Sequence, residues 1–279
     1  MPSAIQHAKA EKLRALHRAP PILVLPNAWD PCSARLFEQA GFPALGTTSA
    51  GVAFSCGYPD GQRLPRAKML QAIRSIAHAV SIPVTADIEA GYGSTIPEVV
   101  ETIEGVLAAG AVGVNLEDAP PHLQGALADP EYQCGLIRAV REAASAAGLS
   151  PVLNARTDVY LEQIGDPAAR FDEAVRRANA YRQAGADCLF VPGVRDSETI
   201  GRLARAIDGP LNILAGLGVP SAPELEQLGV ARVSTGSGPM RATLALLQRI
   251  AAELKQTGSY AAFTGAAIPH AEMNRLFDR

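Results

Sequence analysis

The sequence predicts an α/β fold, a single (β/α)8 TIM barrel domain over residues 1–279. Short apolar, β-like runs alternate with longer stretches rich in alanine, leucine, arginine and glutamate, from about residue 20 to about residue 256. Ala-Gly-Ala or Leu-Gly-Val ends three of the longer stretches, at 109–111, 184–186 and 228–230, where a left-handed glycine can end a helix. One repeated unit without a linker favours a barrel over two domains, and an open doubly wound sheet is the alternative.

Strands and helices are expected in strict alternation. The expected strands are Ile22–Pro26, Ala44–Thr48, Val84–Asp87, Gly113–Leu116, Val152–Ala155, Cys188–Val191, Leu211–Leu214 and Arg232–Ser234. The expected helices between and after them are Pro31–Ala40, Pro65–Val80, Ile96–Ala109, Glu131–Ala147, Ala168–Ala184, Ser197–Ile207, Pro223–Leu228 and Pro239–Lys255. Helical composition also marks Ser3–Arg18 and the end of a tail, about residues 257–279, where Ala266–Asp278 predicts one more helix. Such a tail can cover a neighbouring subunit.

Composition narrows the class of protein. A formal net charge of −3 and a pI of about 6.0 give no electrostatic reason to expect a nucleic acid or a membrane as partner. The four cysteines lie far apart without a C-x-x-C pair, so neither a disulfide framework nor a thiolate zinc site is indicated. The N-terminus has no apolar core segment, and the chain has no apolar run of about 18 residues. We therefore expect a cytoplasmic protein.

Ionisable residues gather where the expected strands end, which is where such barrels carry their catalytic groups. The third strand runs into Asp87 and Glu89, and the two-residue period of a strand places both on one face. The fourth strand runs into Glu117 and the fifth into Arg156. Carboxylates without a histidine or cysteine cluster suit Mg²⁺ or Mn²⁺. Alternatively, Asp87 and Glu117 cap helices or pair with Arg156 structurally.

Other polar residues extend this prediction. The planar fork of Arg156 can grip a carboxylate at two points, with a core ion pair as the alternative. Segment 47–51 offers hydroxyls and amides that can hold an anionic group, although an ordinary turn explains it as well. For Asp118 and Asp158 we expect a structural role as acceptors of loop amides. All four lysines lie in expected helices, so neither Schiff-base nor pyridoxal phosphate chemistry is indicated.

Three motifs together resemble the isocitrate lyase and phosphoenolpyruvate mutase superfamily: DIEAGYG at 87–93, NLED at 115–118 and NARTD at 154–158. PNAWD at 26–30 and GYPD at 57–60 are similar to that superfamily too, so the likeness runs from about residue 10 to about residue 255. The resemblance implies a barrel whose last helix is often exchanged between subunits of a homodimer or homotetramer.

The resemblance also implies a metal and a substrate site. It implies Mg²⁺ bound mainly by Asp87, with further acidic residues reached largely through waters, namely Glu89, Glu117 and Asp60. The substrate, a small 2-oxo or 2-hydroxy carboxylate, is expected beside Thr48, Ser49, Ala50, Asp87 and Arg156. Glu89 stands where many relatives have aspartate, and Thr48 where serine is common.

The chemistry that this site predicts is bond cleavage next to a carbonyl. A metal chelated by a 2-oxo acid stabilises the negative charge on the enolate oxygen when the adjacent bond breaks. We therefore predict a lyase that cleaves the adjacent C–C bond, with oxaloacetate-type decarboxylation as one form. The catalytic candidates are Arg156, Glu117, His122 and Tyr92.

The loop after the fourth strand departs from the family pattern. Isocitrate-type lyases carry Lys-x-Cys-Gly-His there and mutases an asparagine, whereas segment 119–129 has no cysteine, and Cys134 is expected inside the next helix. Reactions that need less of this loop remain, such as decarboxylation or cleavage with another base. His122, with an ordinary pKa of about 6.5, or Tyr92 could be that base. A solvent-exposed loop histidine is the alternative for His122.

Three other functions stay open. A phosphonopyruvate-type P–C mutase or hydrolase shares the enolate chemistry. The glycine-rich segments 215–218 and 235–238 resemble the phosphate cradle of sugar-phosphate barrels, which predicts a metal-independent enzyme. A barrel that binds a 2-oxo acid without turnover is the non-enzymatic alternative. Metal-stimulated turnover separates these hypotheses.

Overall fold

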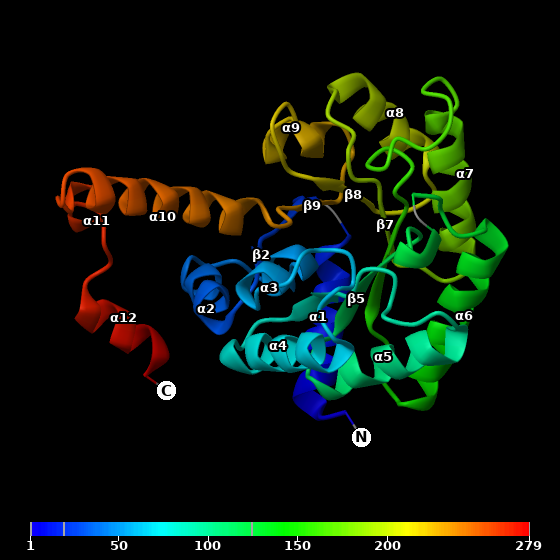
Figure 1. Ribbon diagram of the computed structural model, residues 1–279. Coiled ribbons are helices and arrows are strands. Elements are labelled where there is room, and N and C mark those ends of the chain that lie inside the picture. Colours follow the sequence, from blue (N-terminus) through cyan, green and yellow to red (C-terminus); the bar gives the residue numbers. More distant parts are fainter. Residues whose placement is uncertain (1, 19, 124, 279) are drawn as a thin grey trace.

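The computed structural model describes residues 2–18, 20–123 and 125–278, and its strands form one parallel sheet in the order β1-β9-β8-β7-β6-β5-β4-β3-β2. The strands are β1 (Leu23–Leu25), β2 (Asn27–Ala28), β3 (Leu45–Thr47), β4 (Val84–Asp87), β5 (Gly113–Glu117), β6 (Val152–Arg156), β7 (Cys188–Phe190), β8 (Leu211–Leu214) and β9 (Arg232–Ser234). Because β1 and β2 stand at opposite ends of this order yet adjoin in the chain, the sheet curls into a barrel (Figure 1). The predicted barrel is confirmed, and the open sheet is excluded.

The first predicted strand is interrupted at Pro26. Proline has no N–H for a ladder, so the strand divides there into β1, which pairs with β9, and β2, which pairs with β3. The carbonyl of Pro26 still accepts a hydrogen bond from Gly46 N at 2.9 Å. One chain segment therefore joins both edges of the sheet.

Helices surround the barrel (Figure 1). They are α1 (Ala4–Leu16), α2 (Pro31–Gln39), α3 (Ser49–Ser55), α4 (Arg66–Ala79), α5 (Ile96–Ala108), the 3-10 turn η1 (Pro121–Leu123), α6 (Pro130–Ala146), α7 (Arg170–Gln183), α8 (Ser197–Ala206), α9 (Ala222–Gln227), α10 (Gly238–Gln256), α11 (Ala261–Thr264) and α12 (His270–Phe277). The helices predicted between residues 3 and 255 agree with these bounds to within about two residues, and α3 is an additional helix that the sequence does not predict. None of the helices in the described ranges is long and apolar enough to cross a membrane.

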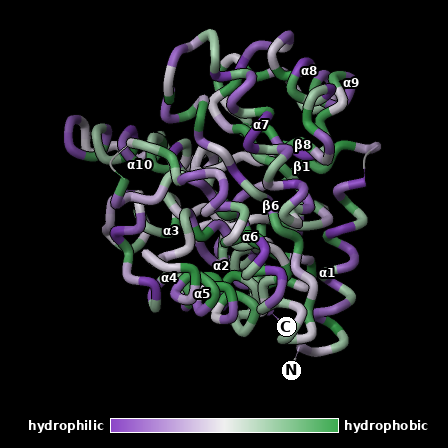
Figure 2. The backbone as a smooth tube through the Cα atoms, turned by 90° about the vertical axis from the view of Figure 1, so that its right-hand side faces the viewer, coloured by the Kyte–Doolittle hydropathy of each residue, from purple (hydrophilic) through white to green (hydrophobic). Residues whose placement is uncertain are grey.

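Helix α1 closes the amino-terminal end of the barrel. Its Leu13 is fully buried, and its Gln6 Nε2 donates to Leu107 O at 2.8 Å and to Ala111 O at 3.3 Å, just before β5. Arg14 reaches Asp187, just before β7. Figure 2 shows α1 along one edge of the molecule, with apolar and polar residues alternating along it. Helix α1 does not cover the opposite, carboxyl-terminal end of the barrel, where the candidate active site lies.

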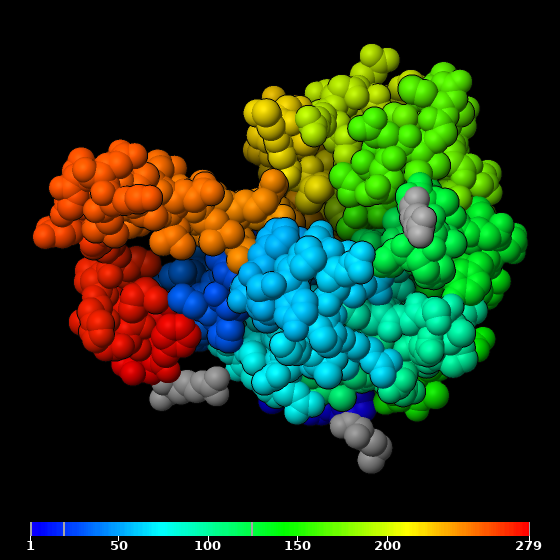
Figure 3. Space-filling model, in the orientation of Figure 1, coloured from blue at the N-terminus to red at the C-terminus, as the bar shows by residue number. Residues whose placement is uncertain are grey.

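The C-terminal tail leaves the barrel. Figure 3 shows α10 to α12 standing out from the body of the molecule, and Met240 is the one buried residue of α10. The helix predicted over 266–278 is present as α12, but it begins only at His270, after Pro269, and the short helix α11 precedes the predicted segment. Arg35 Nε of α2 donates to Leu276 O of α12 at 2.9 Å, which fastens the end of the tail to the barrel.

Candidate active site

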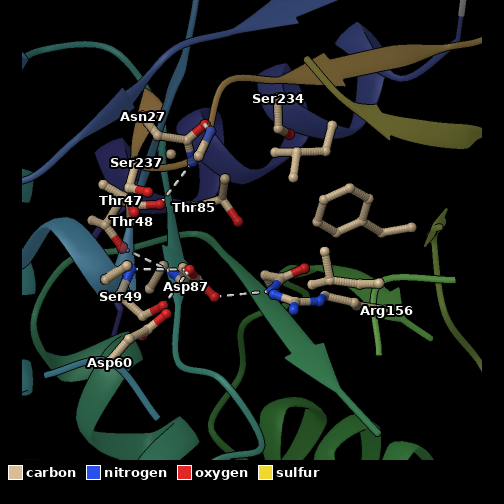
Figure 4. Close-up of a pocket in the computed structure, with 18 of the residues that line it drawn as sticks. Asn27, Thr47, Thr48, Ser49, Asp60, Thr85, Asp87, Arg156, Ser234 and Ser237 are labelled. Atoms are coloured by element: carbon tan, nitrogen blue, oxygen red, sulfur yellow. Dashed lines mark hydrogen bonds between the residues drawn. The ribbon is translucent and has the colours of Figure 1, made fainter. Parts of the chain in front are cut away.

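A cavity of about 190 Å³ opens at the carboxyl ends of the strands (Figure 4). Asp87 lies at its centre, at the end of β4. Its Oδ2 accepts from Ser49 N at 2.9 Å and from Ser49 Oγ at 2.8 Å, and its Oδ1 accepts from Asn115 Nδ2 at 2.9 Å. Asn154 Nδ2 in turn donates to Asn115 Oδ1 at 2.8 Å. A relay across β4, β5 and β6 therefore fixes the carboxylate that the sequence predicts as the main metal ligand.

Segment 47–51 is not an ordinary turn. Thr48 ends the strand segment and caps α3, accepting at Oγ1 from Gly51 N at 3.3 Å, and Ser49 and Ala50 form the first turn of that helix. Thr48, Ser49 and Ala50 all line the cavity, as does Asp60 from the following loop. Burial, as well as the Asp87 charge, raises the pKa of Asp60.

Glu89 reaches the site by a different route from the one predicted. The strand ends at Asp87, and Glu89 takes a left-handed φ of 54°, so strand alternation does not place it. Its Oε1 accepts from Tyr92 Oη at 3.0 Å and its Oε2 from Gln62 N at 2.6 Å. Burial, followed by the charges of Asp87 and Asp60, raises the pKa of Glu89 to about 7. A non-glycine residue in this conformation costs about 1 kcal/mol, and such strain concentrates at functional sites.

Arg156 lies between two carboxylates. Its terminal nitrogen is 2.8 Å from Glu117 Oε2, and its Nε is 2.6 Å from Asp158 Oδ1. Burial raises the pKa of Glu117 well above its ordinary value despite the Arg156 charge, and burial raises the pKa of Asp158 to about 6. The ion pair that was the alternative role for Arg156 thus exists, and Arg156 also lines the cavity. Asp158 is therefore part of this cluster, rather than only an acceptor of loop amides.

Asp118 has the structural role that its position predicts. It is fully buried, accepts from Asp158 N at 3.0 Å and from Tyr181 Oη at 2.7 Å, and pairs with Arg177 at 3.2 Å. Arg177 also donates to Ala128 O at 2.8 Å, at the end of the loop after β5. This network anchors the loop to α7.

A second cavity of about 280 Å³ continues under that loop. It shares Ser49, Asp60 and Arg156 with the first cavity and adds Glu89 and Glu117. Gln124 of the predicted loop lies outside the described residues. Cys134 lies inside α6, as predicted, and is buried.

The two predicted candidates for a base lie elsewhere. Tyr92 and His122 line a neighbouring open groove with Arg66, and neither borders the two cavities. Burial, together with the charge of Glu89, raises the pKa of Tyr92, which therefore stays protonated at neutral pH and donates to Glu89. Tyr92 reaches the site only through Glu89.

The donor chemistry fits a hard divalent cation. Asp60, Asp87, Glu89 and Glu117 supply oxygen only. Within the described part of the chain, no three His, Cys, Asp or Glu side chains lie close enough together to hold an ion directly. The fit is thus to an ion that keeps most of its waters and takes one or two carboxylates, which is how Mg²⁺ binds.

The glycine-rich end of β9 is already occupied by a side chain. Asn27 Oδ1 accepts from Thr235 N and Gly236 N, each at 2.9 Å. These amides are the ones a phosphate cradle would need. The geometry therefore gives no support to a sugar-phosphate site at this position.

Together these features define the class of protein: a (β/α)8 barrel with a cavity lined by carboxylate, hydroxyl and amide groups at the carboxyl ends of its strands. The chain belongs to the phosphoenolpyruvate phosphomutase family, whose model matches residues 13–255. This confirms the superfamily that the motifs resemble.

Relatives cover nearly the whole chain. A protein of Mycobacterium tuberculosis strain H37Rv is 36% identical over 265 residues, covering 94% of this chain and 95% of that protein. The oxaloacetate decarboxylase of Rhodopseudomonas palustris strain TIE-1 is 28% identical, covering 86% and 83%. A crystal structure of a Burkholderia cenocepacia J2315 protein assigned to the lyases and mutases superposes with a TM-score of 0.92 at 40% identity, covering 99% and 98%. Oxaloacetate acetylhydrolase with its product oxalate superposes with a TM-score of 0.85 at 25% identity, covering 97% and 94%.

Proposed function

We propose that this protein is a Mg²⁺-dependent lyase that cleaves the C–C bond next to the carbonyl of a small 2-oxo carboxylate, with oxaloacetate-type decarboxylation as its simplest form. One observation carries the proposal: acidic side chains from three strand ends and a loop converge on Asp87, with Arg156 paired to two of them. The names of the relatives, which include an oxaloacetate decarboxylase, support the reaction class.

The protein's own groups have separable tasks in this reaction. Asp87 would hold a divalent cation, which would stabilise negative charge on the carbonyl oxygen of the substrate. Arg156 uses Nε and one terminal nitrogen for Asp158 and Glu117, and its other terminal nitrogen, without a carboxylate partner among the described residues, can grip the substrate carboxylate. Ser49 and Asn115 keep the Asp87 carboxylate in one orientation.

Decarboxylation then needs one proton. The bond to the departing carboxylate breaks, its electron pair moves toward the carbonyl oxygen, CO₂ leaves, and the carbon takes a proton to give pyruvate. Glu89 borders the cavity, and its carboxylate would be charged once a divalent cation is bound. We therefore assign the proton to a water molecule that the Glu89 carboxylate holds and that solvent reprotonates, and we assign Tyr92 to positioning Glu89. His122 remains a candidate only if the loop brings it from the groove.

The test is pyruvate release from oxaloacetate, methylisocitrate and phosphonopyruvate, each with Mg²⁺ or EDTA. We expect turnover of one of them that EDTA removes and that Asp87→Ala abolishes. Arg66→Met, which changes an exposed ion pair with Glu101, is the matched control and should retain turnover. Tight metal-dependent binding of oxalate without turnover of any substrate would instead favour a binding protein.

We also propose that the tail covers a second copy of the chain in a homodimer or homotetramer. Several apolar side chains of α10 to α12 are exposed, namely Leu244, Leu246, Leu247, Leu254, Tyr260, Phe263, Ile268 and Phe277. Exposed apolar surface of this kind marks an interaction site. Mass measurement by light scattering should give a dimer or larger, and Leu247→Glu should weaken it. A monomer at micromolar concentration would contradict the proposal.

A further inference from the structure

Three residues beside the candidate active site share an unusual backbone conformation. Gln62, Glu89 and Tyr92 take left-handed φ values of 57°, 54° and 57°, and they are three of the four non-glycine residues with a positive φ within residues 2–18, 20–123 and 125–278. This conformation crowds a side chain against its own backbone. It persists only where the surrounding structure holds it, so three such residues close together indicate a common cause.

Hydrogen bonds join these three residues to one another. Gln62 N donates to Glu89 Oε2 at 2.6 Å, and Tyr92 N donates to Gln62 Oε1 at 2.7 Å. Tyr92 Oη completes the ring by donating to Glu89 Oε1 at 3.0 Å. Gln62 is the member that comes from a different loop, since it follows α3 whereas Glu89 and Tyr92 follow β4. The bonds therefore tie two loops together at the rim of the barrel.

The loop that carries Gln62 also carries Asp60, which lines both cavities of the site. The ends of this loop are held by apolar contacts, because Tyr58 packs against the core and Leu64 is buried. Between these ends, no hydrogen bond in the described part of the chain joins residues 59–63 to another segment except the two of Gln62. The place of Asp60 therefore depends on Gln62.

The turn on the other side of the tie is fixed to the barrel. A side chain at Gly91 would overlap Val99 of α5, and a Cβ at Gly93 would lie 2.8 Å from Val99 N. The turn after β4 is thus pressed against the first turns of α5, and it offers a firm support. The loop before α4 is attached to that support by Gln62.

We propose that Gln62 is a positioning residue, which holds the carboxylates of Asp60 and Glu89 at a fixed separation by tying their two loops together. This inference rests on the proposed function, because both carboxylates belong to the proposed Mg²⁺ site. An ion that keeps most of its waters needs acceptors at set places to receive them, and outer partners that orient those acceptors tune its affinity. Gln62 borders neither cavity, so it acts through Asp60 and Glu89.

The first experiment separates positioning from general damage to the site. Gln62→Met removes the amide oxygen and keeps the length of the side chain. We expect Mg²⁺ affinity, measured by calorimetry, to fall about threefold to tenfold, as for the loss of one hydrogen bond. Oxalate affinity at saturating Mg²⁺ should stay unchanged, because Arg156 and the metal bind oxalate. Arg63→Met, an exposed neighbour on the same loop, is the matched control and should change neither affinity.

Hydrogen exchange, read by mass spectrometry, tests the tie itself without metal. Peptides that cover residues 59–63 should exchange about threefold to tenfold faster in Gln62→Met than in the wild type, whereas α4 should exchange at its wild-type rate. Gln62→Glu keeps an acceptor oxygen for Tyr92 N, so it should retain the slow exchange in the presence of Mg²⁺. Arg63→Met should exchange as the wild type does.

The outcomes are distinguishable. Unchanged exchange or unchanged Mg²⁺ affinity in Gln62→Met overturns the positioning role, and so does an equal loss of Mg²⁺ and oxalate affinity. Exchange in Gln62→Glu as fast as in Gln62→Met would overturn the role of the acceptor oxygen. Failure of the wild type to bind Mg²⁺ overturns the proposed function instead, and the exchange rates then decide by themselves whether Gln62 ties the loops.

Discussion

The two ends of the barrel balance their charges in opposite ways. At the amino-terminal end, the carboxylate of Asp187 pairs with two arginines, Arg14 and Arg141, and accepts a hydrogen bond from Leu153 N at 2.8 Å. At the carboxyl-terminal end, acidic side chains outnumber the arginines that line the cavities. Those acidic side chains are Asp60, Asp87, Glu89, Glu117, Asp158 and Glu162, and the arginines are Arg156 and Arg232.

The difference shows which end is built for a ligand. The Asp187 cluster is complete within the chain, so it holds β6, β7 and α1 together. At the other end, burial and neighbouring like charges raise the pKa values of Asp60, Glu89 and Glu117, which means that the folded chain alone leaves their negative charge poorly stabilised. Groups perturbed in this way collect at functional sites. A bound cation would offset this excess of negative charge.

The largest effect should follow from Asp87→Asn, which removes the central charge while keeping the size of the side chain. We expect turnover to fall by roughly 10²–10³-fold, because stabilisation of the developing charge depends on this carboxylate. Steady-state kinetics with Mg²⁺ measures the result, and a variant that keeps wild-type turnover would contradict the central role of Asp87.

The next effect is the pH dependence of metal binding. Folding raises the pKa of Glu89 from about 4.5 to about 7, so the proton on Glu89 stabilises the metal-free fold at low pH, and this contribution is lost as the pH rises through 7. Metal must displace that proton. Mg²⁺ affinity should therefore rise about fivefold from pH 6 to pH 7 and level off about one pH unit above that. Calorimetry in buffers of different ionisation enthalpy would detect the released proton, and a flat profile would contradict the assignment.

Asp187→Asn tests the charge cluster at the amino-terminal end of the barrel. It leaves Arg14 and Arg141 without their carboxylate, and the free energy of unfolding should drop by roughly 2 kcal/mol, less than for a fully buried pair because these side chains are about one-fifth exposed. Turnover and its pH profile should not change in the folded protein. Urea unfolding measures the loss of stability, and steady-state kinetics measures turnover. A change in Mg²⁺ affinity would contradict the view that the two ends of the barrel act independently.

Much of this comparison is readable from the sequence. Strand alternation and strand ends located Asp87, Glu117 and Arg156, because parallel strands deliver their carboxyl ends to one rim. Glu89 was placed on the correct rim for the wrong reason, since a left-handed turn and not a strand carries it there. The bonds of Asn115 to Asp87 and Asn154 depend on which strands become neighbours, and single-strand patterns do not hold that information.

The smallest effect should come from Tyr92→Phe, which removes one hydrogen bond at the carboxyl-terminal end of the barrel. The Tyr92 hydroxyl donates to Glu89 Oε1 and so opposes the rise in the pKa of Glu89. Without it, the pKa of Glu89 should move further up, the pH at which Mg²⁺ affinity levels off should rise with it, and affinity at pH 7 should fall about threefold to tenfold, as for one hydrogen bond to a charged group. Turnover at saturating Mg²⁺ and high pH should recover, because Tyr92 positions Glu89 and does not itself transfer the proton. Persistent loss of turnover at high pH would instead make Tyr92 a catalytic residue.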